Sequence, residues 1–263
     1  MRAMSHPTLP PAGTYLYGIG YASSFRDDSA WPDQSGIGGD DVPVRVIEYG
    51  ELAALVSDAR QEHFDLTREH LLAHERVLEA AMERTAVLPV SFSTITPGDD
   101  EIRERLLKPE YDDLIECLAY VHERIELDLR VLWNRERLFA ELVAENEDIQ
   151  ALRDWIAGQP EEATYYERIQ LGEMTAAEIE RRRERETASI WEALAPLAVE
   201  GTLNETITDM MLLNAAFLVD RAREPAFDAR VRELAESQAE RLIFRYIGPL
   251  PPYSFVNLRL DWE

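Results

Sequence analysis

The stretch TREHLLAHERVLEAAMERTAVLPVSFSTI, from Thr67 to Ile95, decides the fold of the first half of this chain. In its first part, apolar and small residues recur at every third or fourth position, which is the spacing of one face of an α-helix. Its second part alternates in the manner of a half-buried strand. The stretch therefore predicts a helix over Thr67–Thr85 that leads directly into a strand over Val87–Ile95.

Three residues in this stretch carry additional local information. The hydroxyl of Thr67 is placed to cap the first turn of the helix, and Glu69 complements the helix dipole there. Pro89 removes a backbone donor from the predicted strand, so we expect it at a sheet edge, at a strand start or at a bulge. An open edge accepts a strand from a partner protein, whereas a loop of the same chain can equally cover it.

The preceding segments complete a first domain. A strand is predicted over 15–21, and two apolar runs at 44–47 and 52–56 flank a glycine turn and predict a hairpin. The order strand, loop, hairpin, helix, strand is that of a modified ferredoxin-like unit (β-loop-β-β-α-β) whose first helix is shortened or is replaced by the 22–41 loop. This loop carries three large apolar side chains, expected to fold back on the core or to dock a partner: Phe25, Trp31 and Ile37.

The second half predicts a C-terminal α/β domain with a small sheet and a long charged helix, so the fold class is α+β with two domains. We expect a flexible tail over 1–13, a first domain over 14–110 and a second over 111–263. The predicted elements of the second domain are strands over 127–133, 209–219 and 241–247 and helices over 136–156, 174–197 and 225–238.

The long helix holds four arginines among glutamates: Arg181, Arg182, Arg183 and Arg185. Glu178 and Arg182 have the spacing of a favourable ion pair one turn apart. The segment is therefore typical of a solvated helix with many ion pairs, and an arm that holds a partner protein is the alternative.

The composition excludes several classes of function. With 27 basic and 51 acidic residues the formal charge is −24, which repels phosphate backbones and anionic membranes. Lys108 is the only lysine, a bias typical of adaptation to high salt and equally of a GC-rich genome. The single cysteine, Cys117, excludes a disulfide framework. We expect a cytoplasmic protein without a signal peptide or a membrane-spanning helix.

Motifs of catalysis are not evident. His70 and His74 lie four residues apart with His63 upstream, a spacing that can hold zinc, but Leu71 occupies the position where a zincin carries glutamate. His74 also belongs to the apolar stripe, so we expect it to be a structural core residue. No glycine-rich phosphate loop and no nucleophile elbow occur. We therefore predict no catalytic, cofactor-binding or metal-binding residue.

The C-terminal part, 248–263, begins with Gly-Pro-Leu-Pro-Pro-Tyr-Ser-Phe-Val over 248–256. Its prolines stiffen the chain, and the apolar cluster of Tyr253, Phe255 and Val256 must be buried. We expect this tail to lie across the sheet of the second domain, with a partner-binding tail as the alternative.

Taken together, five pieces of the chain resemble the gas vesicle protein F/L family (GvpF/GvpL). They are Tyr15-Leu16-Tyr17-Gly18-Ile19, Leu52-Ala53-Ala54-Leu55-Val56-Ser57, His74-Glu75-x-Val77-Leu78, Val87-Leu88-Pro89-Val90-Ser91-Phe92 and Gly248-Pro249-x-Pro251-Pro252-Tyr253-Ser254-Phe255-Val256. The signature positions among them are His74, Leu78, Pro89, Phe92, Pro251, Tyr253 and Phe255. Ser91 stands where many relatives are expected to carry a basic residue.

The resemblance implies a non-enzymatic accessory protein of gas vesicle assembly, without a cofactor. It implies contacts with the small apolar shell protein GvpA and with other accessory gas vesicle proteins, located at the gas vesicle in the cytoplasm. The contact is expected on the first domain, at Val87, Pro89, Ser91 and Ser93. The alternative is a small-molecule-binding sensor or enzyme with its ligand site between two ferredoxin-like domains.

Overall fold

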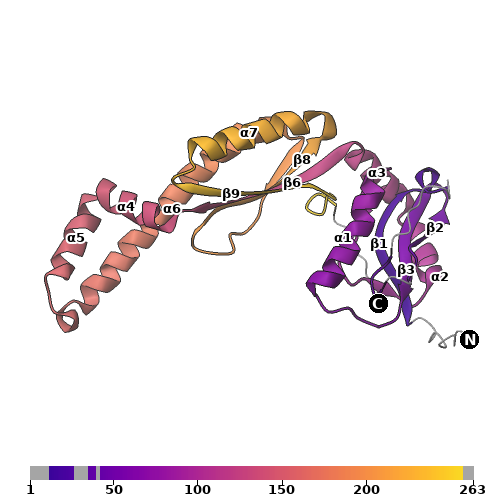
Figure 1. The fold of residues 1–263 in the computed structure, drawn as a ribbon, viewed down its shortest axis with the longest axis horizontal. Helices are drawn as coiled ribbons and strands as arrows, with labels where there is room; N and C mark the ends of the chain where they lie inside the picture. Colours follow the sequence, from indigo (N-terminus) through magenta and orange to yellow (C-terminus); the bar gives the residue numbers. More distant parts are fainter. Residues whose placement is uncertain (1–11, 27–34, 40–41, 257–263) are drawn as a thin grey trace, which may run out of the picture. The chain divides into compact units, whose positions relative to one another are not determined.

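The computed structural model describes residues 12–26, 35–39 and 42–256 and has the expected α+β class (Figure 1). The chain divides into two compact units, one of residues 1–126 with 249–263 and the other of residues 127–248. This division differs from the expected boundary after residue 110, because helix α3 (Tyr111–Val121) packs in the core of the first unit. The expected flexible tail and Trp31 lie largely or wholly outside the described residues.

The first unit is built on one antiparallel sheet, in the strand order β2-β3-β1-β4, with β5 also paired to β1. Helix α1 connects β3 to β4, so the expected order of strand, loop, hairpin, helix and strand is present. The bounds are β1 Gly13–Tyr21, β2 Arg45–Tyr49, β3 Leu52–Ala59, α1 Arg68–Met82, β4 Val87–Pro89, β5 Ile95–Thr96, α2 Asp99–Ile102 and the adjoining π-helix Arg103–Leu107.

Apolar residues cover both faces of this sheet. Tyr15 and Tyr17 of β1 pack with α1 on one face, whereas Leu16 and Ile19 pack with α3 on the other. The pairing register of β1 shifts between Leu16 and Gly18, and this irregularity lets two residues three apart share a face. The Thr67 hydroxyl accepts the backbone N–H of His70, so the predicted cap is confirmed.

The prediction of one nine-residue strand over 87–95 is wrong. Strand β4 ends at Pro89, and the chain turns before pairing again at β5. Ser93 adopts a positive φ of 66°, which a strand cannot contain. Its backbone N–H donates to the Tyr15 hydroxyl at 2.9 Å instead of entering the sheet ladder. Alternating polarity alone does not reveal this turn.

The second unit has a four-stranded sheet with the order β7-β8-β6-β9. Counted within each unit, this is the same strand order as in the first. Its elements follow as β-α-β-β-α-β, with three helices in place of the first one. The bounds are β6 Arg124–Trp133, α4 Arg135–Glu145, α5 Glu147–Ala157, α6 Tyr165–Leu194, β7 Glu200–Leu203, β8 Met211–Asp220, α7 Glu224–Ser237 and β9 Leu242–Leu250.

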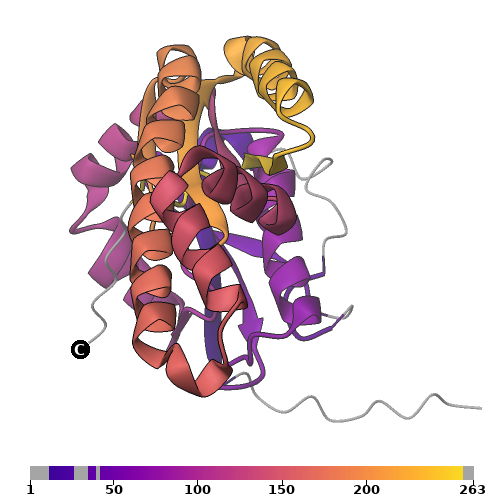
Figure 2. The same ribbon diagram turned by 90° about the vertical axis from the view of Figure 1, so that its left-hand side faces the viewer.

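The three helices α4, α5 and α6 form what we call the helical arm, in which α4 and α5 fold back along α6 (Figures 1 and 2). The single helix expected over 136–156 is interrupted at Asn146, whose side chain accepts the N–H of Ile149 and thereby caps α5. Helix α6 is longer than expected and begins at Tyr165 rather than at residue 174.

Ion pairs of one buried arginine attach α6 to α4. Only 3% of the Arg182 side chain is exposed, and it donates to Glu141 and Glu145 rather than pairing with Glu178. Arg241 also donates to Glu141, at 2.8 Å, and holds the pKa of that carboxyl below its usual value. The expected solvated character therefore fails at Arg182, because this position of α6 faces α4 and not water.

We predict that Glu141→Ala lowers the free energy of unfolding by about 3 kcal/mol, since the largely covered Glu141 carboxylate pairs with both Arg182 and Arg241. The matched control is Glu145→Ala on the same helix, whose side chain is 63% exposed. Its expected cost is about 1 kcal/mol or less. Urea denaturation measures both values, and equal losses for the two variants would contradict the assignment.

Candidate functional site

The C-terminal segment 251–256 packs in the first unit, not across the second unit's sheet as expected. Pro251 and Pro252 are buried, and Val256 joins the cluster that contains Leu88 and Leu118. The buried carboxylate of Glu126 accepts both the N–H and the hydroxyl of Ser254, each at 2.7 Å. The segment is therefore a fixed part of the first unit's core.

A hydrogen-bonded chain of side chains connects this segment to α1 and β1; we call it the Tyr–His chain. His74 lies at its centre and is 1% exposed. Its Nδ1 lies 3.0 Å from the Tyr15 hydroxyl and its Nε2 lies 3.2 Å from the Tyr253 hydroxyl. Tyr253 donates in turn to Glu75 at 3.1 Å, and Tyr15 accepts the N–H of Ser93.

The donors and acceptors of the Tyr–His chain determine its tautomer. Because the proton of Tyr253 goes to Glu75, the Tyr253 oxygen must accept from Nε2–H of His74. Nδ1 is then the acceptor for the Tyr15 hydroxyl. Burial lowers the pKa of His74 to about 4, so the ring is neutral near pH 7. Burial also raises the pKa of Tyr253 and that of Glu75.

The signature positions fall into this core. Leu78 is fully buried under the sheet, and Phe92 packs against His74 with ring centroids 5.9 Å apart. Phe255 is half-buried in the turn that follows Pro252. These residues hold the first unit together, and their arrangement offers no accessible reactive group.

The residues expected to contact a partner are divided by the structure. Val87 and Pro89 are buried on β4, which is an edge strand as the proline rule requires. Ser91 is exposed and Ser93 is half-buried in the turn after β4. Strand β4 packs against α3. With two of the four side chains buried, these residues do not form one continuous exposed surface.

The three histidines considered for zinc do not converge. Both ring nitrogens of His74 face tyrosines, whereas His63 contacts Ser93 and His70 contacts the Asp65 carbonyl. Within the described parts of the chain, no group of three or more histidine, cysteine, aspartate or glutamate side chains is arranged to hold a metal ion.

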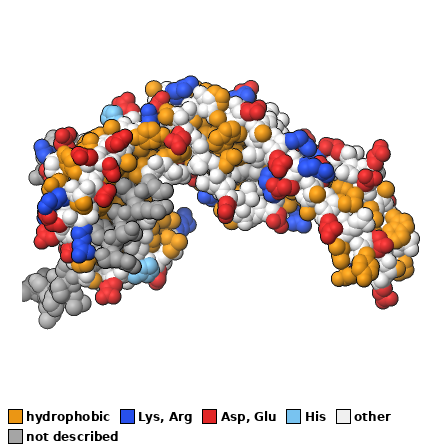
Figure 3. Space-filling view, turned by 180° about the vertical axis from the view of Figure 1, so that it is seen from behind, with side chains coloured by type: hydrophobic (Ala, Val, Ile, Leu, Met, Phe, Trp, Pro, Cys, Tyr) orange, Lys and Arg blue, Asp and Glu red, His pale blue; other side chains and the backbone are white. Residues whose placement is uncertain are grey.

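Exposed apolar side chains gather instead at the end of the helical arm where α5 leads into α6 (Figure 3). Trp155 is 47% exposed and Tyr166 is 80% exposed. Tyr165 and Ile169 extend the same region along α6. A group of exposed apolar side chains on two adjoining helices is typical of a surface that contacts another protein.

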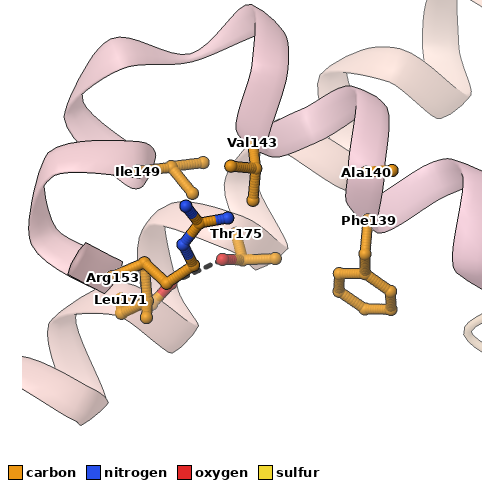
Figure 4. A pocket seen from close by; sticks show the side chains of 7 residues that line it. All are labelled: Phe139, Ala140, Val143, Ile149, Arg153, Leu171 and Thr175. Atoms are coloured by element: carbon orange, nitrogen blue, oxygen red, sulfur yellow. Dashed lines mark hydrogen bonds between the residues drawn. The ribbon is translucent and has the colours of Figure 1, made fainter. Parts of the chain in front are cut away.

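The helical arm also contains a pocket of about 640 Å³ (Figure 4). Side chains from all three helices line it: Phe139, Ala140, Val143, Ile149, Arg153, Leu171 and Thr175. The Thr175 hydroxyl already donates to the Leu171 carbonyl at 2.7 Å, and Arg153 already pairs with Asp154. The pocket therefore offers an apolar surface to a ligand, without converging polar groups of the kind that catalysis needs.

Comparison with known proteins identifies the family. The family model described as gas vesicle synthesis protein GvpL/GvpF matches residues 13–257. The chain belongs to the GvpL/GvpF family. It is therefore a gas vesicle protein, and the match extends over both units.

Individual members of the GvpL/GvpF family are similar along nearly their whole length. Gas vesicle protein F of a Streptomyces species is 34% identical over 246 residues, covering 93% of this chain and 99% of the relative. Gas vesicle protein L of a Streptomyces species is 28% identical over 262 residues, covering 90% and 92%. The crystal structure of GvpF from Microcystis aeruginosa has a TM-score of 0.76 at 29% identity, covering 94% of this chain and 100% of that chain.

The crystal structure of GvpF from an Anabaena species gives the same TM-score of 0.76, with 25% identity and coverage of 95% and 100%. The α+β fold described above is thus similar to that of solved GvpF structures. No helix among the described residues has the length and apolar character needed to cross a bilayer.

Sequence reasoning missed two features of this GvpL/GvpF chain. The pocket of the helical arm lies between three helices, and the periodicity of each helix does not predict how the three pack together. The pairing of Glu126 with Ser254 spans 128 residues. One signal was available for the helical arm, because two adjacent tyrosines and an isoleucine stand among charged residues near 165–169.

We predict that the Tyr–His chain makes stability depend on pH. The folded pKa of His74, about 4, lies below its ordinary value of 6.5. As pH falls through this window, the unfolded state binds a proton that the folded state does not, so stability is lost on acidification. At about 1.4 kcal/mol per pKa unit, the loss from this group is about 3 kcal/mol.

The measurement is the difference in unfolding free energy between pH 7 and pH 4.5 for the wild type and for His74→Gln. The variant is expected to lose this part of the pH dependence, whereas His122→Gln, at an exposed position, retains it. Identical pH profiles for the wild type and His74→Gln would show that His74 is not buried in its neutral form.

Proposed function

We propose that this chain is a non-enzymatic accessory protein of gas vesicle assembly that binds the shell protein GvpA and other accessory gas vesicle proteins. Membership of the GvpL/GvpF family supports the connection to gas vesicles. The apolar pocket of the helical arm, whose polar side chains are already bonded, is the observation that carries the binding role.

The surface chemistry suits a carrier of an apolar protein. A strongly apolar shell protein aggregates when free, and the pocket together with the exposed rings at the end of the helical arm can cover part of it. The net charge of −24 then keeps the complex soluble through repulsion between copies. In this role the protein prevents aggregation of GvpA, or presents it for the start of shell growth, in the cytoplasm at the gas vesicle.

We place the contact on the helical arm rather than on β4. Val87 and Pro89 are buried, so strand β4 does not present them to a partner. By contrast, Phe139 and Val143 line an accessible pocket on α4. Binding there requires no rearrangement of the first unit's core.

The test is capture of GvpA by the full chain after co-expression of the two proteins. Val143→Asp introduces a charge into the pocket and is expected to lower capture by about tenfold, since an unpaired carboxylate is costly against an apolar ligand. Ala144→Asp adds the same charge at the exposed neighbouring position of α4, outside the pocket, and is expected to leave capture unchanged.

Circular dichroism of both variants establishes that the helices are retained. Failure of the wild type to capture GvpA would overturn the proposed function. Equal capture by Val143→Asp and Ala144→Asp would place the contact outside the pocket of the helical arm.

A further inference from the structure

Strand β9 forms one edge of the second unit's sheet. In the order β7-β8-β6-β9 it pairs with β6 on one side only. It is nine residues long, from Leu242 to Leu250, and is therefore longer than β7, the four-residue strand at the opposite edge. An edge strand turns alternate backbone N–H and C=O groups away from its sheet, where a further strand can pair with them.

The inner face of β9 is fixed against a helix. Tyr246 stacks on Phe227 of α7 with ring centroids 6.2 Å apart, and its hydroxyl donates to Asp228 at 2.6 Å. Because side chains alternate along a strand, the residues on either side of Tyr246 point to the opposite face. That face carries Ile243, Arg245 and Ile247, all exposed, with the two isoleucines 50% and 51% exposed.

Arg245 is unpaired among the described residues. It makes no ion pair, hydrogen bond or ring contact there, unlike Arg241, which bonds Glu141 and Glu186. A charged side chain and a proline are common protections of an open edge against indiscriminate pairing, and β9 has Arg245 near its middle and Pro249 near its end. Any strand that adds here must therefore place a compensating group opposite the guanidinium.

We propose that β9 accepts an extended strand of a partner protein that carries a carboxylate between two aliphatic side chains on one face. The aliphatic side chains pack on Ile243 and Ile247, and the carboxylate pairs with Arg245 across the strands. Backbone hydrogen bonds supply the remaining recognition. This inference goes beyond the proposed function, because it concerns a different surface and does not depend on the pocket of the helical arm.

A second copy of this chain does not fit the same edge. Antiparallel pairing of two β9 strands that sets Ile243 of each copy opposite Ile247 of the other also sets Arg245 opposite Arg245, and like charges directly opposite each other are destabilising. The net charge of −24 on each copy adds repulsion. The pairing geometry therefore favours a different protein, whose strand carries a carboxylate opposite Arg245.

The test uses the full chain and fluorescein-labelled peptides. The peptide Thr-Val-Thr-Glu-Thr-Val-Thr places two valines and a glutamate on one face when extended, and its counterpart carries lysine in place of glutamate. Fluorescence anisotropy is expected to show about fivefold tighter binding of the glutamate peptide. Arg245→Glu is expected to reverse this preference, whereas Arg232→Glu, at an exposed position of α7, preserves it.

Strand addition is separated from simple charge attraction by methylating backbone nitrogens of the glutamate peptide. Two versions are made, one methylated at odd and one at even positions, so that each blocks a different peptide edge. One version is expected to lose binding and the other to retain it. The proposal is overturned if both methylated versions bind with equal affinity or if Arg245→Glu leaves the preference unchanged. It is also overturned if the wild type does not bind the peptide or sediments as a dimer.

Discussion

The hydrogen bonds of His74 to Tyr15 and Tyr253 connect three separate parts of the first unit. They join the first strand, the first helix and the C-terminal segment, which are distant in sequence. The chain leaves the first unit after residue 126 and returns to it at residue 249, so in the sequence the second unit is an insertion into the first. Completion of the first core therefore requires nearly the entire chain to have been synthesised.

Local patterns in the sequence predict the elements that are themselves local. The alternation of 127–133 lies inside β6, and the helical periodicity of 225–238 corresponds closely to α7. The cap at Thr67 and the hairpin around Gly50 need only neighbouring residues, and Gly50 has the positive φ of 59° that its turn demands. These features follow from short-range chemistry.

Features that depend on distant partners are not predictable in this way. The turn at Ser93 is held by Tyr15, which lies 78 positions away. Arg182 looks solvated beside its glutamates until α4 is folded against α6. The same holds for the C-terminal segment, since its prolines and aromatic residues indicate burial without indicating which sheet or helix receives them. The pocket of the helical arm could not be predicted from the sequence for the same reason, because it forms only where three helices pack together.

The two units differ in what they offer to other molecules. The first has a continuous core on both faces of its sheet, reinforced by the Tyr–His chain, and is organised for stability. The second carries an apolar pocket and an edge strand whose Arg245 has no ion-pair partner among the described residues. The second unit therefore carries the accessible apolar features on which the proposed binding of other proteins rests.

The central claim is that the C-terminal segment completes the first unit through Tyr253. Hydrogen–deuterium exchange of the full chain carrying Tyr253→Phe tests it directly, with the Ser93 amide and the amides of α1 as reporters. We expect faster exchange at these positions and unchanged exchange in β8 of the second unit. Wild-type exchange rates at Ser93 and throughout α1 in the variant would contradict it.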